Sequence, residues 1–116
     1  MSNKFGVEVK RGMVFMYKPE EAAEKSSVQQ GYRPWLVVSN DTNNKYSTTC
    51  NIVPLTSRHK HNIPVHVHCV IQGINNTIMV EQIRTVEQSE LGNFKWELDD
   101  DIMEKVANAI SIQFSI

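Results

Sequence analysis

Residues 33–57, RPWLVVSNDTNNKYSTTCNIVPLTS, contain two apolar runs separated by a polar stretch. The first run, Pro34–Ser39, has the length and the apolar, β-branched composition of a buried strand. Asn40–Asn44 has the composition of a turn, and Thr48–Leu55 has the composition of another strand. The stretch therefore predicts two neighbouring strands joined by a turn.

The rest of the chain continues this pattern of short strands and turns. Val65–Ile71 alternates apolar and polar side chains with a period of two, as a half-buried strand does. Further elements are expected at the following places: strands at 11–18, 77–86 and 92–97, turns at 57–62 and 73–76, and a loop at 19–32.

A helix is expected at the C-terminus. Asp99 is a good N-cap for a helix over residues 100–114. Its apolar stripe would be made by Ile102, Val106, Ala109, Ile110 and the pair Gln113 and Phe114. Several short strands followed by one helix predict a mainly β fold, a small and strongly bent β-barrel packed on a helix. We expect one domain over residues 1–116.

Charge is unevenly distributed along the chain. The net charge of −1 argues against a general nucleic-acid binder. Residues 1–84 hold ten Lys and Arg against six Asp and Glu, a net of +4, whereas residues 85–116 hold two against seven, a net of −5. The C-terminal acids mostly lie at the front of the expected helix, where they complement its dipole. What remains is a mildly basic body that can bind a few phosphates.

Composition also bears on the compartment. No run of about 18 apolar residues exists, so no membrane span is expected. The N-terminal residues lack the apolar stretch of a secretory signal. Two cysteines, Cys50 and Cys69, are too few for a disulfide framework and are expected to be reduced, half-buried thiols. The chain is therefore expected in the cytoplasm.

Three segments carry a family signature in their order and spacing. They are Arg11–Gly12 followed by QQGYRPWLVVSND at 29–41, then IVPLTS at 52–57, then EQIRTV at 81–86 followed by Leu91–Gly92. Together they resemble the MazF/PemK family of toxin–antitoxin ribonucleases, over about residues 10–114. A single Arg-Pro before an apolar strand would be a weak signal, whereas three ordered segments and a terminal helix make a strong one.

The resemblance implies an SH3-like β-barrel of the CcdB/PemK type and a sequence-specific, metal-independent endoribonuclease. Single-stranded messenger RNA would be cleaved by attack of a ribose 2′-hydroxyl on the adjacent phosphorus, leaving a 2′,3′-cyclic phosphate and a 5′-hydroxyl. No metal or other cofactor is needed, because the nucleophile belongs to the substrate. Relatives act as homodimers and are silenced by a MazE-like antitoxin with a disordered acidic tail.

Three residues match or approach the family's catalytic positions. Arg33 matches the catalytic Arg, and its guanidinium can fork onto a phosphate. From the residues alone, an equal alternative is that Arg33 pairs with a carboxylate such as Glu81 or caps the end of the barrel. Thr56 matches the active-site Thr and can donate to a phosphate oxygen, although an isolated Thr more often closes a turn by bonding its own backbone. Ser27 falls where some relatives place a Ser or His in the same pocket.

Substrate-binding residues are expected beside these positions, at Gln30, Gly31, Tyr32, Ser57 and Glu81. The chain departs from its relatives at two places, because Val28 stands where many have a Glu and Met79 where others have an Arg. The general base is therefore open. Glu81 is a candidate base, and the alternatives are that it orients Arg33 or belongs to a structural network.

Histidines and aromatic residues allow further interpretations. His59, His61, His66 and His68 lie close together beside Cys69, but their spacing matches no standard zinc site, so no metal is predicted. A solvated strand face is expected instead, with a basic rim that holds RNA as the alternative.

Among the aromatic residues, Tyr32 and Tyr17 are expected to be exposed and able to stack on bases. Trp35 and Phe114 are expected in the core, and Trp96 either there or at a dimer interface.

Two other functions stay open. One is a gyrase poison of the CcdB kind, which uses this fold to bind a protein and cleaves nothing; such proteins depend on a different C-terminal end. The other is a binding module that has lost its base, as Val28 suggests. The cut motif cannot be predicted, because the segments at 19–32 and 57–64 are the parts least like the family.

Overall fold

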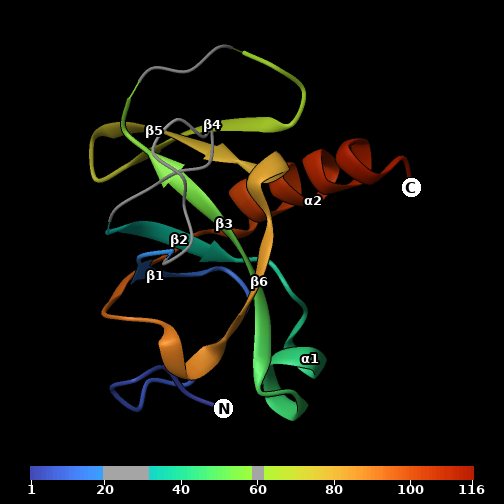
Figure 1. Ribbon diagram of the computed structural model, residues 1–116. Coiled ribbons are helices and arrows are strands. Elements are labelled where there is room, and N and C mark those ends of the chain that lie inside the picture. Colours follow the sequence, from blue (N-terminus) through green and yellow to red (C-terminus); the bar gives the residue numbers. More distant parts are fainter. Residues whose placement is uncertain (20–31, 59–61) are drawn as a thin grey trace.

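The computed structural model of the chain describes residues 1–19, 32–58 and 62–116. Seven antiparallel strands form one curved sheet in the order β4-β5-β3-β2-β1-β7, with β6 paired to β3 (Figure 1). The elements in chain order are β1 (Met13–Tyr17), β2 (Arg33–Val37), α1 (Asp41–Tyr46), β3 (Thr49–Thr56), β4 (His66–Ile71), β5 (Ile74–Met79), the 3-10 turn η1 (Val80–Gln82), β6 (Arg84–Glu87), the 3-10 turn η2 (Gln88–Glu90), β7 (Phe94–Glu97) and α2 (Asp100–Phe114). The predicted mainly β fold with a C-terminal helix is confirmed.

Strand β3 is the central strand of the sheet. It pairs with β2 through Ile52–Pro54, with β6 through Thr49–Ile52, and with β5 through Leu55 and Thr56. Pro54 cannot donate a backbone hydrogen bond. It lies between the residues that pair with β6 and those that pair with β5, so neither of these two ladders loses a donor at this position.

The alternation of side chains along β3 feeds two hydrophobic cores. Val53 and Leu55 belong to the first core, which Met103, Val106 and Ala109 of α2 cover. Cys50 and Ile52 point to the opposite face and belong to the second core. That second core comprises Val9, Phe15, Tyr17, Trp35, Val37, Cys50, Ile52, Val86 and Leu91.

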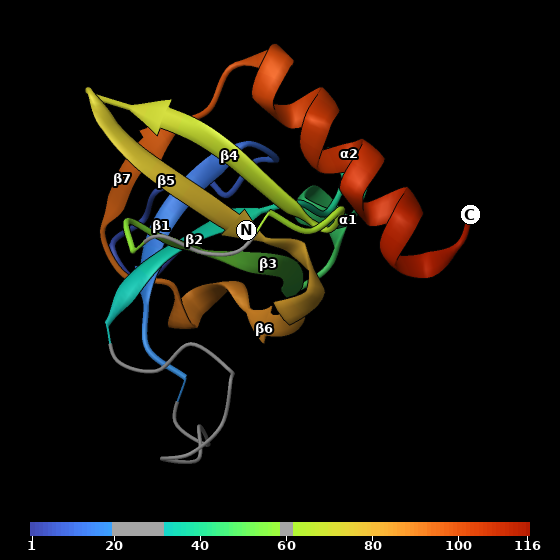
Figure 2. The ribbon, with the colours of Figure 1, turned by 90° about the horizontal axis from the view of Figure 1, so that it is seen from above.

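Helix α2 begins where the sequence predicts. The carboxylate of Asp99 accepts a hydrogen bond from the backbone N–H of Ile102 at 2.9 Å, which confirms the N-cap. The expected stripe packs on the first core, but Phe114 is 51% exposed and does not belong to it. The C-terminal end of α2 projects beyond the sheet (Figure 2). Among the described residues, no helix has the length and apolar character of a membrane span.

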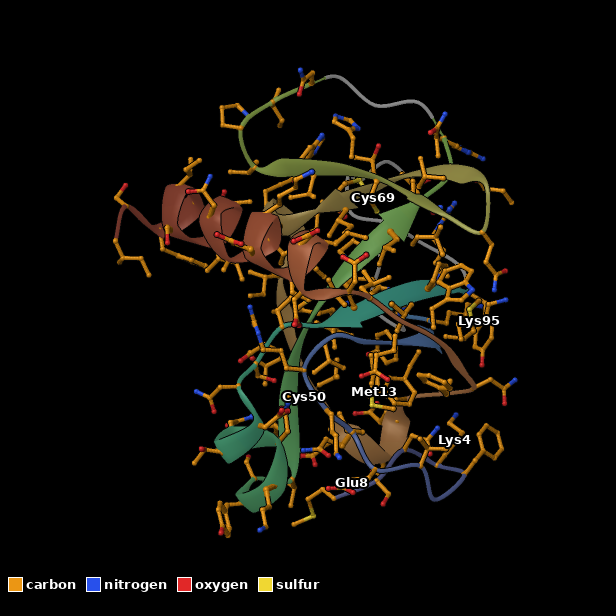
Figure 3. The ribbon with its side chains drawn as sticks, turned by 180° about the vertical axis from the view of Figure 1, so that it is seen from behind. Lys4, Glu8, Met13, Cys50, Cys69 and Lys95 are labelled. Carbon is orange, nitrogen blue, oxygen red and sulfur yellow. The ribbon has the colours of Figure 1, made fainter. Side chains whose placement is uncertain are left out.

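Both cysteines are free thiols, and each lies in a different part of the fold (Figure 3). Cys50 is fully buried in the second core rather than half-buried, whereas Cys69 is half-buried against the first. Burial raises the pKa of the Cys50 thiol to about 12. Cys50 is therefore neutral and unreactive at physiological pH.

The turn expected at 73–76 is shorter than predicted, because β5 already begins at Ile74. The register opposes Ile71 to Ile74, which leaves a two-residue turn of Gln72 and Gly73. Both residues have positive φ, 51° and 79°. A two-residue hairpin turn with two positive φ values fits the right-handed twist of paired strands, and Gly adopts such values readily.

The single strand expected over 77–86 is interrupted by η1. Continuing the β5 register, in which Ile78 is opposite Leu55, would place Glu81 opposite Ile52. Arg84 occupies that position instead, three residues further along the chain. The three residues of η1 account for this shift, and they take Glu81 out of the ladder.

Asn40–Asn44 is part of a helix rather than a turn. The Asn40 side chain caps α1 by accepting from the N–H of Asn43 at 2.8 Å. The buried Asn44 side chain donates to the carbonyl of Ser39 at 2.9 Å. The amide nitrogen of Gln88 lies 3.0 Å from the carbonyl oxygens of Asn44, Ser47 and Thr49. These tertiary bonds stabilise a helix too short to persist alone.

Replacing Gln88 with Met should test this anchor, because Met keeps the side-chain length but removes the donors. Carbonyl groups left without a partner should lower the free energy of unfolding by about 1–3 kcal/mol. Urea unfolding measures the change, with the exposed Gln113→Met on α2 as the matched control. Equal stability of the two variants would contradict the anchoring role of Gln88.

Candidate active site

Four of the residues predicted from the sequence line one pocket of about 260 Å³, here named the Arg33 pocket. They are Tyr32, Arg33, Thr56 and Ser57. The remaining lining residues are Pro34, Leu55, Ile71, Gln72, Ile74, Asn76 and Trp96. The pocket is therefore built from five strands and the ends of their turns.

The pairing of β2 with β3 brings Arg33 and Thr56 together. In this antiparallel ladder Trp35 is opposite Pro54. Continuing the register outward by two residues puts Arg33, the first residue of β2, opposite Thr56, the last residue of β3. In an antiparallel pair, the beginning of one strand lies beside the end of the other. A cation and a hydroxyl that are distant in sequence therefore meet at the same end of the β2–β3 pair.

The hydroxyl of Thr56 already makes one hydrogen bond. Its oxygen accepts from the backbone N–H of Arg58 at 3.2 Å, the turn-closing contact that was the alternative interpretation of this residue. A hydroxyl also carries one proton to donate. Thr56 can therefore close the turn and still donate to a ligand in the pocket.

Glu81 does not line the Arg33 pocket. Its carboxylate bonds to Nε2 of His66 at 2.8 Å, with 7% of the His66 side chain and 31% of the Glu81 side chain exposed. The expectation that His66 lies on a solvated strand face is thus wrong, because η1 covers it. Within the part of the chain that the structure describes, the second carboxylate oxygen of Glu81 is buried without a hydrogen-bond partner.

Several predictions fall on residues outside those described. Ser27, Gln30 and Gly31 belong to this group, as does Val28. So do His59 and His61. Among the described residues, no three His, Cys, Asp or Glu side chains are grouped as metal ligands.

Among the lining residues that the sequence did not indicate as site residues are Gln72, Asn76 and Trp96, whose side chains can hydrogen-bond. Gln72 and Asn76 reach the pocket through the hairpin of β4 and β5, whose turn was misplaced. Trp96 is half-buried, packs against the first core and also lines the pocket. Only the pairing of β5 with Thr56 could have indicated Asn76, and no local pattern shows that pairing.

The aromatic predictions are half right. Tyr32 is 55% exposed and Trp35 is fully buried, as expected. Tyr17 is buried, because its ring packs edge-on against Trp35 and lies under the guanidinium of Arg84. Tyr17 is therefore part of the second core and is not available to stack on a base.

Comparison with known proteins identifies the family. Residues 10–114 match the family described as PemK-like, MazF-like toxin of type II toxin-antitoxin system. The chain belongs to this family. It is 34% identical to the endoribonuclease EndoA of Bacillus subtilis, over 93% of this chain and 96% of EndoA. It is also 34% identical to the endoribonuclease MazF of Staphylococcus saprophyticus, over 93% of this chain and 92% of MazF.

Solved structures agree with this assignment at the level of the fold. An endoribonuclease in complex with its cognate antitoxin, from a mycobacterial species, superposes with a TM-score of 0.78 at 24% identity. The alignment covers 93% of this chain and 96% of that one. The predicted family and the fold of the MazF/PemK toxins are confirmed.

Gly92 belongs to the third segment shared with this toxin family, and its neighbours explain why it is Gly. A methyl carbon at this position would overlap the hydroxyl of Tyr32 and lie 2.8 Å from the carbonyl oxygen of Met16. The backbone N–H of Gly92 donates to that same oxygen at 2.7 Å. The absent side chain thus makes room for the tip of Tyr32, whose ring borders the Arg33 pocket.

Replacing Gly92 with Ala should overpack this contact and lower the free energy of unfolding by about 1–3 kcal/mol. Adding Tyr32→Phe should restore part of the loss, because it removes the overlapping hydroxyl but leaves the Met16 carbonyl. Thermal or urea unfolding of both single variants and the double variant measures this. Strictly additive effects would contradict the contact between Tyr32 and Gly92.

Proposed function

We propose that this MazF-type toxin cleaves single-stranded RNA, in particular messenger RNA, at the Arg33 pocket, with Arg33 and Thr56 as catalytic residues. One observation carries the proposal: the guanidinium and the hydroxyl come from two segments that match the family and line one pocket. Tyr32 and Ser57 line the same pocket and would bind the substrate. Ser27, Gln30 and Gly31 complete the proposed site, and Glu81 remains a proposed substrate-binding residue.

The relatives support this activity. Both curated relatives are endoribonucleases and align over nearly their whole length. The enzyme class predicted from the sequence is thereby confirmed. A gyrase poison or an inactive module finds no comparable support among these matches.

The reaction needs no group beyond the protein and the RNA. The ribose 2′-oxygen forms a bond to the adjacent phosphorus, and the bond from phosphorus to the 5′-oxygen breaks. The 2′-hydroxyl gives up its proton and the departing 5′-oxygen gains one, so a cyclic phosphate and a 5′-hydroxyl remain. Because the nucleophile is part of the substrate, the protein must mainly hold it in line and stabilise the phosphorane.

Arg33 and Thr56 would both stabilise the negative charge on the oxygens of the phosphorane. The guanidinium binds non-bridging oxygens whose charge grows from one toward two as the phosphorane forms. The Thr56 hydroxyl donates to one of these oxygens while it accepts from the N–H of Arg58. Among the described lining residues none is a carboxylate or an imidazole, so we propose that the proton acceptor comes from outside this lining.

The decisive experiment is incubation of the purified protein with a long single-stranded RNA in EDTA. We expect discrete fragments from the wild type, whereas a gyrase poison or an inactive module would leave the RNA intact. Arg33→Ala should lower the cleavage rate by about 10²–10³ while keeping most RNA affinity, because the guanidinium gains more from the transition state than from bound substrate.

Two further variants give that experiment its controls. Arg33→Lys should recover little, because a point charge cannot supply two parallel hydrogen bonds. Thr56→Ala should lose less than Arg33→Ala, since a neutral hydroxyl makes a weaker bond. Melting temperatures measured alongside must stay near that of the wild type. Wild-type cleavage by Arg33→Ala would refute the site.

We also propose that the chain acts as a homodimer, because the family resemblance implies one and a barrel of this size offers a short groove for several nucleotides. Light scattering at micromolar concentration should then report about twice the chain mass of 13.3 kDa. A strict monomer that still cleaves RNA would contradict the dimer.

A MazE-like antitoxin is the proposed protein partner. Among the solved structures of similar fold is a MazE–MazF complex from Deinococcus radiodurans, with a TM-score of 0.72 at 19% identity. The antitoxin would cover the RNA site with an acidic segment. We propose the cytoplasm as the place of action, since messenger RNA is translated there.

A further inference from the structure

A second depression, of about 390 Å³, adjoins the Arg33 pocket on the hairpin of β4 and β5. It is here named the hairpin pocket. Its polar lining is Ser57, Arg58, His68, Asn75, Asn76 and Thr77. Ser57 and Asn76 line both pockets, so the two depressions are continuous. A chain bound at Arg33 can therefore run directly over the hairpin.

Arg58, the cation that lines the hairpin pocket, is hydrogen-bonded through its backbone to the hydroxyl of Thr56, the candidate catalytic residue. Arg58 is exposed, and its backbone N–H donates to Oγ1 of Thr56 at 3.2 Å. This bond fixes the start of the Arg58 side chain two residues beyond Thr56. A phosphate adjacent to the scissile one in a nucleic-acid strand would meet this second guanidinium.

The uncharged side chains of the hairpin pocket are hydrogen-bonding groups of the kind that read base edges. Asn75 is exposed on β5. The amide nitrogen of Asn76 donates to the carbonyl of Ile74 at 3.1 Å, and Asn76 also lines the pocket. Nδ1 of His68 bonds to the hydroxyl of Thr77 at 3.1 Å, which orients the imidazole ring.

We propose that the hairpin pocket is a nucleotide subsite of this enzyme, in which Arg58 binds the phosphate next to the scissile one and Asn75 reads the edge of its base. The inference rests on the RNA cleavage proposed above. Unstacked bases of single-stranded RNA expose their edges to side-chain amides, which is how proteins read such RNA. Asn75 thus determines part of the sequence preference, and Arg58 contributes affinity without preference.

The charge of the neighbouring cavity limits how far the bound RNA strand extends. His68 also lines a larger cavity whose other lining residues come from β4, α2 and the segment before β4. Among the described residues, that cavity carries the carboxylates of Asp101 and Glu104 and the ammonium of Lys105. A phosphate is repelled there, whereas Arg33 and Arg58 attract it. The path of the bound RNA strand therefore ends at His68, one nucleotide beyond the Arg33 pocket.

The first test measures binding of an RNA that carries a single 2′-deoxy substitution at its mapped cut site, which removes only the nucleophile. Arg58→Ala should weaken binding by about 3- to 10-fold and reduce the slope of log affinity against log salt by about 0.7, the value for one phosphate contact on a single strand. Lys45→Ala is the matched control, because Lys45 is exposed on α1 and lines neither pocket. Indistinguishable affinities and slopes for the two variants would overturn the role of Arg58.

The second test reads sequence preference. Cleavage of a randomised RNA pool, followed by sequencing of the product ends, should show Asn75→Ala relaxing the preference at one position beside the cut. Arg58→Ala should slow cleavage at all sites alike. An unchanged preference in Asn75→Ala would overturn its role, even if the wild type cleaves as proposed. Absence of cleavage by the wild type would instead refute the proposed function itself.

Discussion

The pairing of β3 with three other strands is the interaction on which the rest of the molecule depends. This strand of eight residues pairs with β6 at its beginning, with β2 along its middle and with β5 at its end. β5 and β6 pair with different parts of β3, and a three-residue shift in register separates them. The two strands therefore do not form one straight strand, and the twisted sheet curves around β3. The three-residue shift at η1 and the position of Pro54 both follow from this division.

The same pairing explains why the site lies where it does. The ladder of β2 with β3 ends in Arg33 and Thr56, and neither residue belongs to either hydrophobic core. Their neighbours Trp35 and Leu55 are fully buried and hold the two strand ends rigidly. The backbone at these strand ends is therefore already ordered and adds little entropic cost when a ligand binds.

Residues whose environment depends on local pattern could be predicted from the sequence, and residues whose environment depends on register could not. Trp35 lies in an apolar run and Asp99 precedes an amphipathic stretch, so both were placed correctly. Helix α1 was missed because part of its support comes from Gln88, which bonds to Asn44 at a separation of 44 residues. His66 was misplaced because nothing in β4 indicates that Glu81 leaves its ladder and packs over it.

The candidate site was predicted only as far as the family resemblance reaches. Arg33, Thr56, Ser57 and Tyr32 share one pocket because the family signature follows the ladder of β2 with β3. Three other lining residues lie outside these short segments: Gln72, Asn76 and Trp96. The pairings of β5 and β7 bring them to the pocket. No periodicity in a single sequence encodes which strand lies beside which.

The pairing of β1 with β7 has a consequence for the synthesis of this toxin. Val14 is opposite Trp96, so β1 is synthesised well before the strand with which it pairs. The Arg33 pocket also needs Trp96 as a wall, although its cation and hydroxyl are made much earlier. Closure of such a distant contact is slow compared with that of a hairpin. While the chain is being synthesised, Arg33 and Thr56 are therefore present before the pocket that they share with Trp96 is complete.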